Sequence, residues 1–259
     1  GSWDISGGQV YKEFSTSVHG IVPFEIPEHW ERLRGLDFGL RNPTAVSWVA
    51  VDEYGNLFVY DEHYKPEMLP EQHAVIIYAK SAKKTPEGMP QQYFNSYETD
   101  GKTFLPCIAD PSGQNRGMGS KEKLFDEYRK FGIACIPANN DWPLKYARVS
   151  QYLHFDPNHV HPITKSQGSP RMFVFNTCVE TIKEFIGYEW EAVPVSGDRD
   201  GADRPKKHND HIMDELGYVC ATRPDPSQLK TLEEPESHYI QMARGAFTQE
   251  SAFEGEYQE

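Results

Sequence analysis

The chain has 259 residues, which is enough for one large domain or two small ones with a buried core. Hydrophobic residues make up 38% of it, but no apolar run reaches the roughly 18 residues that a membrane span needs. The net charge of −13 argues against a general DNA-coating protein, while it is compatible with carboxylates gathered to hold cations.

Three strands are expected at the start of the chain. Residues 3–30 contain two prolines and show no helical period, so we expect an extended lead-in. The run RLRGLDFGL then predicts a short strand that ends near Asp37. Two β-rich runs follow within residues 43–64, and DEYGN at 52–56 separates them with a turn signal typical of a hairpin. The three strands are therefore predicted to be consecutive and antiparallel.

Helices and short buried strands alternate in the rest of the chain. Helices are predicted from apolar periodicity and capping residues over 70–84, 121–132, 141–155, 176–190 and 208–222. Apolar runs between them predict strands over 104–110, 133–138 and 171–175. This order indicates an α/β fold with a mixed sheet flanked by helices, as in the ribonuclease-H-like architecture.

The composition changes near residue 224. Residues 224–259 hold eight acidic and two basic residues, a balance of −6, and are rich in Pro, Glu and Ser. We expect an acidic, flexible tail there. The predicted organisation is a lead-in over 1–30, an α/β domain over 31–223 and the tail over 224–259.

The four cysteines suggest no metal site. They are Cys107, Cys135, Cys178 and Cys220, and no two of them form a CxxC pair, so a zinc site is not expected. Free, buried thiols in a reducing compartment are the preferred interpretation. The chain also has no GxxxxGK[ST] phosphate loop and no GxSxG motif, so we expect no ATP hydrolysis from it.

Four acidic residues are the candidates for chemistry. Asp37 ends the first predicted strand in GLDFG, and Asp110 ends a later strand in CIADPSG. Asp210 and Asp214 lie in the predicted final helix, in HNDHIMDELGY. Carboxylates at strand ends can converge at one sheet edge, and a helix across that edge can add more. Hard cations such as magnesium prefer these ligands, and two ions about 4 Å apart can stabilise both reacting oxygens of a phosphodiester.

Each candidate also has a purely structural interpretation. An Asp before Gly or Pro at a strand end is often a turn former. His211 is either a structural hydrogen-bond partner or a metal ligand with Asp214. Asp210 and Asp214 repel each other at i,i+4 on a helix, and a packed helix that carries both favours a bound cation. For that reason we expect Asp214→Asn to leave the metal-free fold at least as stable as the parent.

Basic residues near the acids are the candidates for DNA contact. Arg204, Lys206 and Lys207 precede the final helix, and Arg116 lies in a glycine-rich loop after Asp110. They form either a basic rim that contacts phosphates or a solubilising surface, and both interpretations stay open.

Three motifs, in this order, resemble the nuclease domain of tailed-phage large terminases. RGLDFGLRNPTAVSWVAVDEYGNLFVYDEHY is similar to the acidic first strand and hairpin of that family, and CIADPSG is similar to its second acidic strand. NDHIMDELGYVCAT resembles its closing DHxxDAxRY helix, with Glu215 where Ala is usual and Gly217 where Arg is usual. The lead-in WDISGGQVYKEFS resembles the segment that joins the packaging ATPase to the nuclease, so the resemblance covers about residues 3–222.

The resemblance implies a ribonuclease-H-like fold related to the Holliday-junction resolvases. It implies cutting of concatemeric viral DNA, that is, of linked genome copies. It also implies Mg²⁺ or Mn²⁺ as cofactor, with two ions in the site. Asp37, Asp110 and Asp214 match the metal-binding acids of the family. Asp210 and His211 lie in the same closing motif, as a further metal ligand and a further catalytic candidate.

The implied partners are double-stranded DNA, an ATPase domain of the same protein that this chain lacks, a portal and a small terminase subunit. No membrane is implied. The protein would act in the host cytoplasm as part of the packaging motor and not in the mature virion. Two alternatives stay open: another nuclease on this fold, such as a junction resolvase or transposase, and a non-catalytic docking module.

Overall fold

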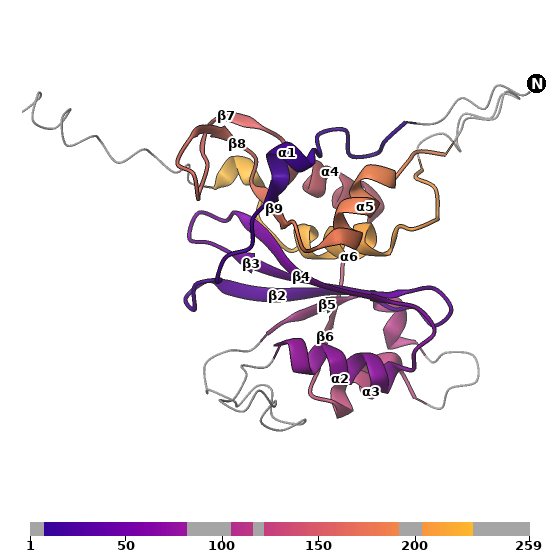
Figure 1. Cartoon of the computed structure of the whole chain (residues 1–259). Helices are drawn as coiled ribbons and strands as arrows, with labels where there is room; N and C mark the ends of the chain where they lie inside the picture. The colour runs from indigo at the N-terminus through magenta and orange to yellow at the C-terminus, as the bar shows by residue number, and fades with distance from the viewer. Residues whose placement is uncertain (1–7, 82–104, 116–121, 192–203, 230–259) are drawn as a thin grey trace, which may run out of the picture. The chain divides into compact units, whose positions relative to one another are not determined.

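A computed structural model describes residues 8–81, 105–115, 122–191 and 204–229 of the chain (Figure 1). The chain forms two compact units. The larger unit contains a seven-stranded sheet and its helices. The smaller unit includes the antiparallel hairpin of β7 (Asp156–Val160) and β8 (Gln167–Ser169), which the sequence analysis did not predict. Within the described ranges, no helix has the length and apolarity needed to cross a membrane.

The sheet of the larger unit is mixed. Its strands lie in the order β1-β9-β4-β3-β2-β5-β6. Their bounds are β1 (Gly20–Ile21), β2 (Glu31–Asp37), β3 (Thr44–Val51), β4 (Leu57–Lys65), β5 (Cys107–Ala109), β6 (Cys135–Pro137) and β9 (Met172–Phe175). Strands β2, β3 and β4 are antiparallel, whereas β5 and β6 extend the sheet from β2 as parallel strands. The predicted antiparallel start and the mixed sheet of an α/β fold are confirmed.

The hairpin between β3 and β4 forms where the sequence predicts it. Oδ1 of Asp52 accepts hydrogen bonds from the amides of Tyr54 and Asn56, at 2.9 and 2.8 Å. Gly55 has a φ of 79°, a value that residues with a Cβ rarely adopt. The Asp side chain and the glycine together close the turn, and they set the register of the two central strands.

Helices cover both faces of this sheet (Figure 1). One face carries α4 (Trp142–Leu153), α5 (Val179–Gly187) and α6 (His211–Ala221), and the other carries α2 (Pro70–Ser81) and α3 (Leu124–Lys130). The remaining helical turns are α1 (Thr16–His19), η1 (Pro111–Gln114) and η3 (Pro226–Gln228). Helix α6 contacts β2, β3 and β5 directly, so it crosses the sheet beside the strands that carry Asp37 and Asp110.

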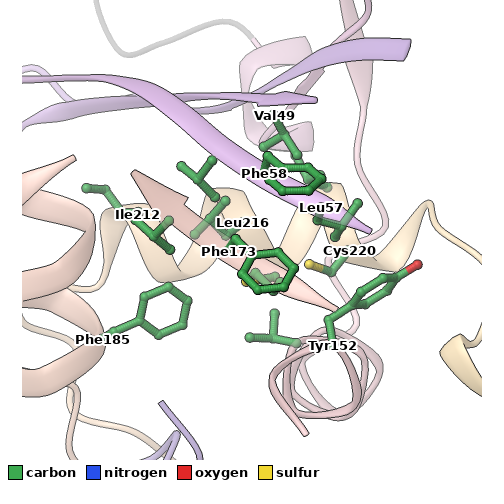
Figure 2. Close-up of a cluster of buried hydrophobic side chains, with 14 of the residues drawn as sticks. Val49, Leu57, Phe58, Tyr152, Phe173, Phe185, Ile212, Leu216 and Cys220 are labelled. Carbon is green, nitrogen blue, oxygen red and sulfur yellow. The ribbon is translucent and has the colours of Figure 1, made fainter. Parts of the chain in front are cut away.

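The main core lies between the sheet and helices α4 to α6 (Figure 2). The rings of Phe58 and Phe173 stack there at a centroid distance of 5.2 Å. From α6, Ile212 and Leu216 are buried against them. Burial of each such side chain stabilises the fold by about 1.5–3 kcal/mol. The apolar face of α6 thus fixes the helix against the sheet.

Residues 8–30 are not simply extended. Residues 16–21 form α1 and β1, and Val10, Tyr11 and Phe14 are buried in the main core. The prediction of an extended lead-in is therefore wrong for these residues. Their apolar side chains are too few to show a helical period in the sequence, but they still pack on the core. The division at residue 30 stays a prediction.

The first residues of the expected tail belong to the larger unit. The Tyr152 hydroxyl donates to the Pro224 carbonyl at 3.1 Å, and Arg148 lies 3.3 Å from the Asp225 carboxylate. Residues 230–259, most of that tail, lie outside the described residues. The tail boundary at 224 stays a prediction.

Candidate active site

Two of the predicted acids lie at the carboxyl ends of neighbouring strands. Asp37 is the last residue of β2, and Asp110 directly follows β5. The two strands are parallel, with Leu36 opposite Ala109, and the amide of Asp110 donates to the carbonyl of Leu36 over 3.1 Å. Parallel strands bring their carboxyl ends to one sheet edge. Asp37 is buried there and Asp110 is half-buried.

Helix α6 adds His211 and Asp214 at the same edge. Nδ1 of His211 lies 2.9 Å from Oδ2 of Asp37, so the first residue of α6 is bonded to the last residue of β2. Of the two roles left open for His211, this contact favours the hydrogen-bond partner, and the acid that it contacts is Asp37. Asp214 lies one residue short of a full turn further along α6.

Electrostatics link the three carboxylates. The pKa of Asp37 is raised by burial and by the charges of Asp214 and Asp110, while the hydrogen bond from His211 opposes the shift. The pKa of Tyr218 is raised by burial and by the charges of Asp214, Asp37 and Asp110. Asp37 and Asp110 stand at the adjacent ends of β2 and β5, and α6, which carries Asp214 and Tyr218, contacts both strands. We call Asp37, Asp110 and Asp214 the acidic cluster.

Asp210 borders the acidic cluster without lying inside the helix. It is the N-cap of α6, and its backbone carbonyl accepts from the amide of Asp214 at 2.8 Å. Its side chain is buried but makes no capping hydrogen bond to α6. The pKa of Asp210 is raised by burial and then by the charge of Asp214. The prediction that the helix begins before Asp210 is wrong: the helix begins at His211, and a side chain from another element binds its free amides.

That side chain is Glu184 of α5, a residue the sequence analysis missed. Its Oε2 accepts from the amides of Ile212 and Met213 at 2.8 and 3.2 Å. A carboxylate in this place satisfies free amides and complements the helix dipole. Burial raises the pKa of Glu184 to about 7, although these hydrogen bonds oppose the shift. Glu184 therefore holds the N-terminus of the helix that carries the site residues.

Lys145 of α4 is the second residue that the sequence analysis missed. Its side chain is 5% exposed, and Nζ lies 2.5 Å from Oδ1 of Asp214 and 2.9 Å from Oδ1 of Asn140. The ammonium also lies 4.5 Å from the ring centroid of Tyr218. Lys145 and Asp214 are 69 positions apart, and Lys145 stands in an ordinary amphipathic helix, so no local pattern signals this contact.

The two departures from the closing family motif have separate structural explanations. Glu215 is fully buried and accepts a hydrogen bond from the Ser47 hydroxyl, and burial raises its pKa well above the ordinary value. It belongs to the core between α6 and the sheet. Gly217 leaves room for Lys145, because a Cβ at Gly217 would lie 3.1 Å from Cβ and Cδ of that lysine.

The predicted DNA-contact residues are only partly described. Arg204, Lys206 and Lys207 are exposed on the segment just before α6. Lys206 forms an ion pair with Glu189 at 2.7 Å, and the charge of Lys207 partly opposes the rise in the pKa of Asp210. Arg116 lies outside the described residues. The three described residues thus lie beside the N-terminus of α6, and their contact with DNA stays a prediction.

The acidic cluster suits a hard divalent cation by its donor type and charge. A cation between these carboxylates would relieve the repulsion that Asp37 experiences from Asp110 and Asp214. Across the described ranges, however, no three His, Cys, Asp or Glu side chains already surround a point that could hold a metal. Asp214 instead faces Lys145, and Asp37 faces His211. The fit lies in the donor chemistry and not in a preformed coordination shell.

Comparison with known proteins supports the fold. No protein-family model and no curated protein matches the chain. Among solved structures, the nuclease domain of the P22 large terminase superimposes with a TM-score of 0.59 at 18% identity, over 84% of this chain and 93% of that domain. The large terminase of a thermophilic bacteriophage, solved with ADP, gives a TM-score of 0.59 at 20% identity. This second match covers 86% of the present chain but only 46% of the terminase.

Identities this low establish a shared architecture and leave activity to be argued from the site. The chain therefore has the ribonuclease-H-like fold of the nuclease domains of phage large terminases.

Proposed function

We propose that this chain is a divalent-metal-dependent DNA endonuclease that cuts concatemeric viral DNA during genome packaging. The observation that carries the proposal is the acidic cluster. It draws carboxylates from β2, β5 and α6 to the edge of the sheet where these strands end. A phosphodiester bond is hydrolysed most readily where fixed cations offset the charge that develops on its oxygens. Carboxylates arranged in this way are suited to hold such cations.

Asp37, Asp110 and Asp214 would hold the cation, with Asp210 as a further ligand. Two Mg²⁺ or Mn²⁺ ions, when bound, would supply Lewis-acid stabilisation of the attacking and leaving oxygens. His211 orients the Asp37 carboxylate through its 2.9 Å contact. Arg204 and Lys207, exposed beside α6, would contact the phosphates of double-stranded DNA.

The length of a matched protein supports one of the expected partners, the ATPase domain. The chain covers about half of the large terminase that was solved with ADP. We propose an ATPase domain in the same protein, with the portal and the small terminase subunit as further partners in the host cell. The chain itself has no phosphate-binding loop, so it would cut DNA but not translocate it.

A plasmid assay tests this proposal. The parent should nick or linearise supercoiled DNA with Mg²⁺ or Mn²⁺, and excess chelator should abolish cutting. Asp37→Asn and Asp110→Asn should lower the rate at least 100-fold, as expected for loss of a ligand. Asp126→Asn is the matched control, because Asp126 is an exposed acid of α3 that pairs with Arg129. Cutting that persists in chelator, or in both site variants, would refute the proposal.

Two further substrates separate the alternatives. A junction resolvase would cut a four-way junction in preference to linear duplex DNA, and a packaging nuclease would not. A docking module would cut neither substrate under any metal condition.

A further inference from the structure

The acidic cluster contains a cation that belongs to the protein itself. Lys145 is buried, and its ammonium lies 2.5 Å from Oδ1 of Asp214. A buried ammonium is costly unless it is paired and hydrogen-bonded. Lys145 meets both conditions, through Asp214 and through the side chain of Asn140 at 2.9 Å. The contact is therefore built into the fold.

The surroundings of Lys145 are shaped to bring it there. Its alkyl chain passes over Gly217 of α6, where a Cβ would lie 3.1 Å from Cβ and Cδ of the lysine. Its ammonium lies over the ring of Tyr218, which adds a cation–π contact at 4.5 Å. Helices α4 and α6 pack against each other along this line. The space at Gly217, the ring of Tyr218 and the packing of α4 on α6 thus together direct the positive charge of Lys145 at Asp214.

The contact uses one oxygen of the carboxylate. Lys145 bonds Oδ1 of Asp214, and within the described ranges Oδ2 accepts no hydrogen bond. When a hydrogen bond fixes one oxygen of a carboxylate, the other oxygen keeps a constant direction. Outer-shell partners orient metal ligands in this way. At the same time, a positive charge so close to a ligand must repel a divalent cation.

We propose that Lys145 is a positioning residue with two opposed effects on the acidic cluster. It neutralises and orients Asp214 before a metal binds, and it weakens the binding of that metal by its own charge. The inference rests on the proposed metal-dependent function. It implies that the charge of Lys145 limits metal affinity while the orientation it imposes on Asp214 raises the cutting rate.

Four proteins test this: the parent, Lys145→Met, Lys145→Arg and Arg148→Met. Methionine keeps the unbranched chain of lysine without its charge, and arginine keeps the charge. Arg148 lies one turn further along α4 and pairs with Asp225 at 3.3 Å, so its loss removes an ion pair outside the acidic cluster. Mn²⁺ binding is measured by electron paramagnetic resonance of the free ion. Melting temperatures are measured in chelator and in saturating Mn²⁺, and plasmid cutting is measured in saturating Mn²⁺.

Lys145→Met should melt below the parent in chelator, and Mn²⁺ should close much of that gap. It should bind Mn²⁺ about tenfold more tightly, because a repelling charge is gone, and yet cut at least tenfold more slowly. Lys145→Arg should stay near the parent in affinity. Arg148→Met should lose the same stability with and without metal.

Different results would refute the proposed function and the proposed role of Lys145. If the parent binds no Mn²⁺ and does not cut, the proposed function fails. If the parent binds Mn²⁺ and cuts, but Lys145→Met binds no more tightly or keeps the parent's cutting rate, only the role of Lys145 fails. Should Lys145→Met fail to fold in chelator, Lys145→Gln replaces it in the binding and cutting measurements, with the same expected directions.

Discussion

Nδ1 of His211 lies 2.9 Å from Oδ2 of Asp37, and this contact joins the start of α6 to the end of β2. The two residues are 174 positions apart in the chain. Their hydrogen bond fixes the orientation of a carboxylate that is buried and that experiences the charges of Asp110 and Asp214. Any cation bound at this edge would meet a carboxylate whose direction His211 has set.

Replacement of His211 should therefore affect cutting through Asp37. His211→Asn places an amide nitrogen close to the position of Nδ1 and should keep most of the activity. His211→Leu removes the donor and should lower the cutting rate about 10- to 100-fold. Rates in saturating Mn²⁺, with circular dichroism to confirm folding, measure both. Equal rates for the two variants would show that the hydrogen bond does not matter.

Asp214→Asn should abolish cutting and also destabilise the metal-free fold. From the sequence alone, the variant is expected to be at least as stable as the parent, because the sequence shows only the repulsion between Asp210 and Asp214. The structure adds Lys145, whose buried ammonium would lose its counter-charge. We expect a loss of about 1–3 kcal/mol in the free energy of unfolding, measured by urea denaturation in chelator. Asp210→Asn removes no such ion pair and should lower the free energy of unfolding by less. A larger loss for Asp210→Asn than for Asp214→Asn would contradict this prediction.

Arg204 and Lys207 should contribute to DNA affinity without contributing to stability. Both are exposed beside α6. Their joint replacement by alanine should weaken duplex binding and lower the slope of log affinity against log salt by about 2. Lys183→Ala is the control, since Lys183 is an exposed lysine of α5 that pairs with Glu180. If both proteins show the parent's slope, the basic residues form a solubilising surface.

Gly35 and Glu215 should behave as a coupled pair. A Cβ on Gly35 would overlap Oε2 of Glu215, so Gly35→Ala should destabilise the fold by about 3 kcal/mol. In the double variant with Glu215→Ala, the carboxyl group is gone, although the Glu215 carbonyl remains 2.7 Å from that Cβ. The double variant should therefore lose less than the sum of the single losses by at least about 1 kcal/mol. Additive losses in chemical denaturation would argue against this contact.

A buried histidine pair should make stability depend on pH. Nε2 of His63 lies 2.8 Å from Nδ1 of His73, and burial and the charges of His73, Lys80 and Lys65 lower the pKa of His63 to about 4. The unfolded chain, with a histidine pKa near 6.5, therefore takes up a proton more readily than the fold. The contribution of the neutral His63 to the free energy of unfolding is complete above about pH 6.5, and about 3 kcal/mol of it is lost as the pH drops to 4.

The variant His63→Gln isolates this effect. Its free energy of unfolding should fall less than the parent's between pH 7 and pH 4.5. His154→Gln replaces an exposed histidine at the end of α4 and should follow the parent. A His63→Gln profile parallel to the parent's would show that this pair does not titrate as described.

The strands and most helices could be predicted from sequence because their signals are local. DEYGN closes its hairpin through the side chain of Asp52 and the positive φ of Gly55, both within five residues. Asp37 and Asp110 could be placed at strand ends for the same reason, since each follows an apolar run. Helix ends were less predictable: α6 begins at His211 because Glu184, from another helix, binds its free amides.

The environment of the acids depends on tertiary structure. Lys145 and Glu184 reach α6 from α4 and α5, and no spacing in the chain relates them to Asp214 or His211. Sequence determined which residue types could bind a cation and roughly where they stand along the chain. Only the packing of helices on the sheet decided that His211 faces Asp37 and that a buried lysine faces Asp214, because burial and Coulomb interactions depend on distance in space.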